Sequence, residues 1–161
     1  MSNAKIIGIM ACAKNGVVGK DGAVPWRYSG DLQHFRSTIG NSPIIMGRKS
    51  FEVMPQSFLK DRTVIVFSRK KRPSIQDAIF VASLEGFFAL SVLPEMPVMY
   101  MIGGAQLANF FLDNKLISEF ILTRLNRPYT GDAVLKLKAF DGWSTEVIKE
   151  TANYAILIKK A

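Results

Sequence analysis

The feature that most constrains this fold is a series of short apolar runs that alternate with helix-like segments and then continue as strands alone. The first run, Ile6 to Ala13, is nearly continuous, which is typical of a strand covered on both faces. Alternation with helices predicts parallel strands, whereas Ser144 to Lys149 and Tyr154 to Lys159 follow each other directly and predict an antiparallel hairpin. We therefore predict an α/β fold.

In this fold a single three-layer domain over residues 1–161 has a mixed, mostly parallel central sheet of about eight strands, about four flanking helices and a C-terminal antiparallel hairpin. Residues 1–4 are set aside as an added remnant or a flexible start. Before the hairpin, the expected strands are Ile6–Ala13, Pro43–Met46, Thr63–Phe67, Ile79–Ala82, Val98–Ile102 and Phe120–Thr123. The expected helices are one that begins near Ser29, Phe51–Met54, Ser83–Leu90 and Ala105–Leu112.

The composition is that of an ordinary globular protein, with 48% hydrophobic and 21% charged residues, and it excludes a disordered chain. Cys12 is the single cysteine and lies in an apolar run, so we expect a buried thiol and no internal disulfide. One cysteine and one histidine, His34, do not suffice for a metal cluster, and no metal is expected. Without a signal peptide or membrane span, we expect a cytoplasmic protein that does not bind a membrane.

The net charge of +8 favours an anionic partner: a nucleic acid, a phosphorylated cofactor or a polycarboxylate. The one dense basic run is Arg69 to Arg72, and a solvated turn closed by Pro73 explains it equally well. A nucleic-acid-binding module would interleave aromatic residues with exposed cations, whereas the aromatic residues here lie mostly in apolar runs. We therefore expect no nucleic-acid partner and keep that function as an alternative.

Two predicted strands end in turns suited to a ligand. Gly47-Arg48-Lys49-Ser50 combines free backbone N–H groups, two cations and a hydroxyl, the makeup of a phosphate site, although such turns also occur in solvent. Gly103-Gly104 permits close approach of the backbone to a ligand and equally serves a tight turn. Ligands of such sheets gather at the carboxyl ends of the strands. We therefore expect one cleft that collects Asp31, Arg48, Ser68, Gly103 and Gly104.

Asp31 lies in the first turn of the helix that begins near Ser29, on the same face as Phe35. An acid at this position commonly just faces the helix dipole, and the local pattern favours that interpretation. The alternative is a functional carboxylate at the edge of an apolar surface. The preceding segment, Lys14 to Trp26, is long for a compact domain, and such loops often cover a functional site.

Taken together, the motifs resemble dihydrofolate reductase over essentially the whole chain, in the order of that family. They are Asn15-Gly16-Val17-Val18-Gly19, Val24-Pro25-Trp26, Asp31-Leu32 with Phe35, Ile45-Met46-Gly47-Arg48-Lys49-Ser50-Phe51, Ile102-Gly103-Gly104, Leu122-Thr123 and Gly131-Asp132. This resemblance reverses the interpretation of Asp31 in favour of function. A related NADPH-dependent reductase of riboflavin synthesis is the alternative, although it does not normally combine Pro-Trp with Asp-Leu-x-x-Phe.

The resemblance implies reduction of 7,8-dihydrofolate, with hydride transfer to C6 of the pterin and protonation of N5. Asp31 would bind and orient the pterin, Thr123 would bond that acid, and water beside Trp26 would supply the proton. Arg62 would hold the glutamate α-carboxylate. The remaining residues implied to line the substrate site are Ile9, Ala11, Leu32, Phe35, Met54 and Ile102. The implied partners are dihydrofolate, also in polyglutamylated form, and antifolate inhibitors, and we expect a monomer.

The resemblance also implies NADPH as the cofactor, with Arg48 and Arg69 on its 2′-phosphate and residues 16–26 as a loop that closes over the nicotinamide. The implied cofactor-binding residues are Ala11, Val18, Gly19, Gly47, Arg48, Lys49, Ser50, Ser68, Arg69, Ile102, Gly103, Gly104, Ala105 and Gln106. The chain departs from the family at Ala105, where a third glycine is common, at Ala108, where an aromatic residue is usual, and at Gln106, where some relatives are basic. Residues 58–61 lack the usual prolines.

Overall fold

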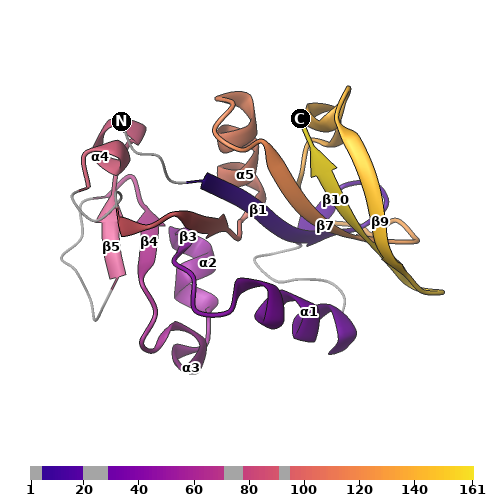
Figure 1. Cartoon of the computed structure of the whole chain (residues 1–161), viewed down its shortest axis with the longest axis horizontal. Helices are drawn as coiled ribbons and strands as arrows, with labels where there is room; N and C mark the ends of the chain where they lie inside the picture. Colours follow the sequence, from indigo (N-terminus) through magenta and orange to yellow (C-terminus); the bar gives the residue numbers. More distant parts are fainter. Residues whose placement is uncertain (1–4, 20–28, 71–77, 91–94) are drawn as a thin grey trace.

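The computed structural model describes residues 5–19, 29–70, 78–90 and 95–161, apart from the side chains of 19 and 29–32. An eight-stranded mixed sheet runs through the molecule in the order β5-β4-β3-β6-β1-β7-β10-β9 (Figure 1). Its strands are β1 (Lys5–Cys12), β3 (Ile44–Gly47), β4 (Val64–Phe67), β5 (Ala78–Val81), β6 (Val98–Met101), β7 (Glu119–Leu125), β9 (Ser144–Glu150) and β10 (Tyr154–Lys160). The predicted α/β architecture with its C-terminal hairpin is confirmed.

The six strands from β5 to β7 in this order are parallel, so their carboxyl ends lie at one edge of the sheet. Only β10 and β9 run antiparallel to their neighbours. At the centre, Gly8 of β1 pairs with Met101 on one side and Phe120 on the other. A Cβ on Gly8 would lie 2.3 Å from the Phe120 ring, so the ring occupies the space that any larger residue needs.

Helices cover both faces of the sheet and give the three layers that the sequence predicts. On one face, α1 (Ser29–Ile39), α2 (Arg48–Val53) and α3 (Gln56–Leu59) pack on a core that includes Ile9, Ile44 and Ile121. On the other, α4 (Leu84–Phe88), α5 (Ala105–Asp113) and the 3-10 helix η2 (Leu137–Phe140) pack on a core that includes Phe87, Phe111 and Phe120. Figure 1 shows α1, α2 and α3 on the side of the sheet away from α5.

The structure has two features that the sequence did not predict. The helix α3 is a fifth helix, and it is missed because four residues after Pro55 are too few to display a helical period. The strands β2 (Val17–Gly19) and β8 (Ala133–Val134) form a separate two-stranded sheet within segments expected to be loops. Strands of two or three residues carry no recognisable alternation.

Hydrogen bonds tie this small sheet to α5. The side chain of Asn109 donates to the carbonyl oxygen of Val134 at 3.0 Å and accepts from the backbone N–H of Lys136 at 2.9 Å. Between them, the N–H of Leu135 donates to the carbonyl oxygen of Gly16 at 2.8 Å. The start of the loop that follows β2 is therefore fixed to the rest of the fold.

Two kinds of feature are absent from the described ranges. No helix within them has the length and apolar character required to cross a membrane. No group of three or more histidine, cysteine, aspartate or glutamate side chains there is arranged to hold a metal ion.

Candidate functional site

Two turns meet at the carboxyl edge of the sheet, where neighbouring strands β3 and β6 end. The backbone N–H of Gly47 donates to the carbonyl oxygen of Gly103 at 2.9 Å. One step earlier, the N–H of Ile102 donates to the carbonyl oxygen of Ile45, also at 2.9 Å. The predicted convergence of the Gly47 turn and the Gly103-Gly104 pair is confirmed.

Two helices begin at these turns without a side chain that caps them. Gly47 is the N-cap of α2 and Gly104 is the N-cap of α5, and neither position has a side-chain capping bond. The first backbone N–H groups of a helix have no partner within it, so they are available to an anion. Ser50 adds a hydroxyl, whose oxygen lies 3.5 Å from the position of a Cβ on Gly104.

Gly103 has the conformation that requires glycine. Its φ is +118°, and the peptide bond that joins it to Gly104 is cis. A Cβ at Gly103 would approach the Cε of Met10 to 3.1 Å. Bare backbone is thus maintained here by conformation as well as by space, and the surface beside it accepts close contact with a flat or charged ligand.

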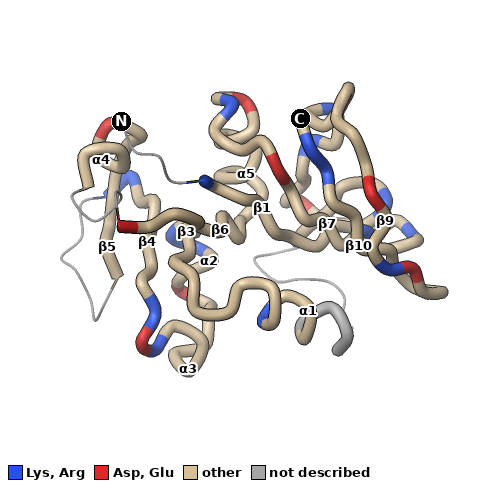
Figure 2. Tube along the Cα trace, viewed as in Figure 1, with Lys and Arg blue, Asp and Glu red and all other residues tan. Residues whose placement is uncertain are grey.

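The predicted phosphate-binding cations lie along the same edge. The Arg48 guanidinium donates to Glu52 Oε1 at 2.9 Å and is about one-third exposed. Lys49, Arg69 and Gln106 are exposed. Ser68 is buried, and its hydroxyl donates to the carbonyl oxygen of Lys70 at 3.0 Å, which shapes the turn that presents Arg69. Figure 2 marks these cations in blue at the ends of β3 and β4.

An apolar face lies next to this edge, on the side covered by α1, α2 and α3. It collects the predicted pterin and benzoyl residues whose side chains the structure describes: Ile9, Ala11, Phe35, Met54 and Ile102. Ile9 is buried and the other four are half-buried, as a ligand-binding wall requires. Two phenylalanines missing from the predicted set also belong to it, Phe51 and Phe58. The spacing of Phe51, Met54 and Phe58 is the signal that identifies them.

Thr123 is one of two buried polar side chains among the described residues, with 3% of its surface exposed. It lies on β7 beside Ala11 of β1 and alternates with Ile121 and Leu125, which belong to the apolar face. Because alternate strand residues share a face, Thr123 points toward that face. A hydroxyl is thus available at the wall of the apolar site.

Arg62 is held in place by the main chain. Its Nε donates to the carbonyl oxygen of Phe58 and its Nη1 to that of Ser42, both at 3.2 Å. The guanidinium carbon lies 4.7 Å from the centre of the Phe58 ring. Partial burial lowers the pKa of Arg62 but leaves it charged. These bonds leave three of the five N–H donors for a carboxylate.

Several predicted residues belong to other places. Trp26 lies outside the described residues, as do the side chains of Asp31, Leu32 and Gly19; the backbone of Asp31 lies in the first turn of α1. Val18 and Ala105 are buried in the core on the α5 side, and Ala108 is fully buried there. The aromatic residue that this core contains is Phe111, whereas Phe110 is 43% exposed.

Cys12 has the buried character that the sequence predicts. It has no exposed surface, and burial raises the pKa of its thiol to about 12, against the opposing effect of Arg124 and Lys159. A thiol with so high a pKa remains protonated and unreactive at neutral pH. Cys12 is therefore a core residue at the end of β1.

Comparison with known proteins gives one consistent result. The family model for dihydrofolate reductase matches residues 5–155. Dihydrofolate reductase of Staphylococcus haemolyticus is 31% identical over 139 residues, covering 86% of this chain and 81% of the relative. The Candida albicans enzyme is 32% identical, over 80% and 72% of the two chains, and that of Neisseria gonorrhoeae is 36% identical, over 80% and 77%. The chain belongs to the dihydrofolate reductase family.

Proposed function

We propose that this protein is an oxidoreductase that reduces 7,8-dihydrofolate to 5,6,7,8-tetrahydrofolate with NADPH. Family membership supports this activity over the alternative reductase of riboflavin synthesis. The observation that carries the proposal is the meeting of the Gly47 and Gly103 turns beside an apolar face that Thr123 shares. An anionic cofactor and a flat, largely apolar substrate would there lie next to each other.

The residues at the sheet edge fit a dinucleotide phosphate. Bare backbone at Gly103 and Gly104 gives it a surface to lie on, and the open N–H groups at Ala105 and Gln106 are suited to the pyrophosphate. Arg48 and Arg69 would bind the 2′-phosphate that distinguishes NADPH from NADH. When bound, NADPH supplies the hydride that C6 of the pterin accepts.

The acid at the start of α1 would orient the substrate. In this proposal Asp31 accepts hydrogen bonds from the pterin ring N–H and amino group, and the apolar surroundings strengthen these charge-assisted bonds. Thr123 is placed on the wall behind, where its hydroxyl would bond the acid. Trp26 would border the path of the water that protonates N5. Asp31 thus positions and polarises the ring without donating to N5 directly.

Arg62 would fix the glutamate end of the substrate. Its bonds to two main-chain carbonyl oxygens orient the guanidinium before a ligand arrives. A preoriented group loses little conformational entropy when it binds a carboxylate. We assign Arg62 to the α-carboxylate on this ground.

The proposal is tested by mixing purified protein with dihydrofolate and NADPH and following the absorbance of the reduced nicotinamide. We expect consumption of one NADPH for each tetrahydrofolate formed, and none when either substrate is omitted. A folded protein that consumes no NADPH with dihydrofolate would refute the proposal. Turnover with the riboflavin precursor alone would favour the alternative reductase.

A further inference from the structure

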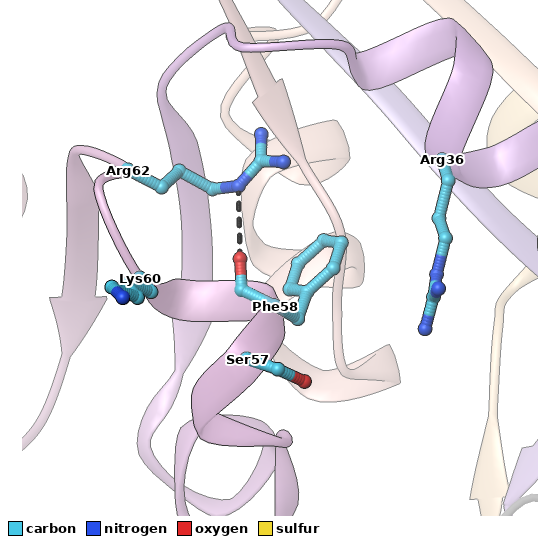
Figure 3. A pocket seen from close by; sticks show the side chains of 5 residues that line it. All are labelled: Arg36, Ser57, Phe58, Lys60 and Arg62. Atoms are coloured by element: carbon cyan, nitrogen blue, oxygen red, sulfur yellow. Dashed lines mark hydrogen bonds between the residues drawn. The ribbon is translucent and has the colours of Figure 1, made fainter.

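Three cationic side chains line one hollow on the α1–α3 side of the sheet. Arg36 comes from α1, and Lys60 and Arg62 come from the segment between α3 and β4. With Ser57 and Phe58 they enclose about 290 Å³, near the lower end of the volumes of small-molecule sites. Figure 3 shows Arg36 across the hollow from Phe58 and Arg62.

No carboxylate lines this hollow to balance the three cations. In the part of the chain that the structure describes, the ion pairs involve Lys5, Arg48 and Lys136, so none of the three belongs to one. Asp61 stands between Lys60 and Arg62 in sequence, but it is exposed and does not line the hollow. Cations that share a site without an acid repel one another, and an anionic ligand relieves this repulsion.

The hollow adjoins the proposed substrate site through two stacked rings. Phe58, which lines the hollow, stacks on Phe35 with ring centres 5.8 Å apart. Phe35 belongs to the apolar face that would hold the pterin and benzoyl groups. A substrate tail that leaves this face past Phe35 therefore meets the three cations.

The three cations differ in how firmly they are held. Arg62 is half-buried and bonded to two main-chain carbonyl oxygens, so its position is fixed. Arg36 and Lys60 are exposed at the rim and can move to follow a ligand. Such an arrangement suits one carboxylate at a set position and further carboxylates at variable distances.

We propose that Arg36 and Lys60 extend the Arg62 site to bind a substrate tail with more than one carboxylate. Arg62 takes the first carboxylate, and the two rim cations take those of additional γ-linked glutamates. The enzyme then prefers dihydrofolate with a chain of glutamates to the form with a single one. This inference rests on the proposed function and names the form of the substrate that the site selects.

The test compares dihydrofolate with one, two and three γ-linked glutamates by kcat/KM and by calorimetric binding. Each exposed ion pair changes affinity by about twofold to fivefold, so we expect the wild type to prefer three glutamates to one by about threefold to tenfold, mainly through KM. In the double variant Arg36→Gln/Lys60→Gln this ratio falls to about one. Added salt reduces it in the wild type because these pairs are exposed.

The matched control is Lys138→Gln/Lys160→Gln, which removes the same charge from two exposed lysines outside the hollow. It should retain the wild-type preference. Turnover that does not depend on tail length in the wild type, or a preference that survives in the Arg36/Lys60 variant, would overturn the inference and leave the proposed function intact. Absence of turnover with all three compounds would refute the proposed function, and calorimetry would still decide whether affinity depends on tail length.

Discussion

The backbone N–H of Gly47 and the carbonyl oxygen of Gly103 lie 2.9 Å apart, and this bond joins the turns at the ends of β3 and β6. It links two glycines that are 56 positions apart in the sequence. Both turns lead into helices without side-chain caps, so the bond places two sets of open N–H groups at one edge. The proposed cofactor site is a consequence of this pairing.

Gly104→Ala is expected to weaken NADPH binding more than it affects folding. The φ of Gly104 is −77°, and a Cβ there would make an ordinary contact of 3.5 Å with Ser50 Oγ. The methyl group would nevertheless occupy the surface proposed for the cofactor, so KM for NADPH should rise about tenfold with a loss of less than about 1 kcal/mol in unfolding free energy. Steady-state kinetics and urea unfolding measure the two effects.

Gly86→Ala in α4 is the control, because its Cβ would make a similar contact of 3.4 Å with Ser83 Oγ. KM for NADPH should not change in this variant. An unchanged KM in Gly104→Ala would contradict the placement of the cofactor on Gly104.

Arg69→Ala should lower the affinity for NADPH far more than that for NADH. Arg69 is exposed at the end of β4, and a charge-assisted bond to the 2′-phosphate exists only with NADPH. Loss of such a bond costs roughly 1.5–3 kcal/mol, about tenfold or more in the dissociation constant. Titration of both cofactors by calorimetry, with Lys138→Ala as the charge control, measures the difference. Equal losses for the two cofactors would exclude this contact.

Gly8→Ala should destabilise the protein because the Phe120 ring already fills the space beside Gly8. Overpacking of this kind typically costs about 1–3 kcal/mol. The double variant Gly8→Ala/Phe120→Leu should lose less than the sum of the single losses, since the smaller side chain admits the new methyl group. Urea unfolding of the four proteins gives the coupling, and strict additivity would argue against the contact.

Cys12 should make the protein less stable at alkaline pH. Burial raises the pKa of the folded thiol from 9.0 to about 12, so its contribution to stability is complete below about pH 9 and is lost as the pH rises toward 12. Unfolding free energies on either side of pH 9 should fall more steeply in the wild type than in Cys12→Ala. Parallel pH profiles would show that the thiol does not have a raised pKa.

Much of the fold follows from the sequence because its strands are apolar runs of four or more residues, separated by helices or turns. Each of the eight sheet strands was predicted within a few residues, from Ile6–Ala13 to the C-terminal hairpin. The pairing of β2 with β8 could not be predicted, because it depends on contacts such as Leu135 with Gly16, far apart in sequence. Local pattern carries no information about such contacts.

The site was predictable to a different extent at each position. Strand-end glycines indicate that Gly47 and Gly103 lie at one edge, because parallel strands align their carboxyl ends. The partners of individual side chains were not predictable. The pairing of Arg48 with Glu52 and the two carbonyl bonds of Arg62 depend on rotamers and on the exact path of the chain around α3.

The most direct test of the central claim compares the wild type with Asp31→Asn in NADPH-dependent reduction of dihydrofolate at neutral pH. Asp113→Asn, at an exposed acid on α5, is the control, and thermal unfolding verifies that all three proteins are folded. We predict robust turnover by the wild type and the control. The asparagine amide cannot accept both pterin bonds as a charged group, so Asp31→Asn should lose at least several tens-fold, on the order expected of a positioned acid–base group. Equal rates for the wild type and Asp31→Asn would contradict the account.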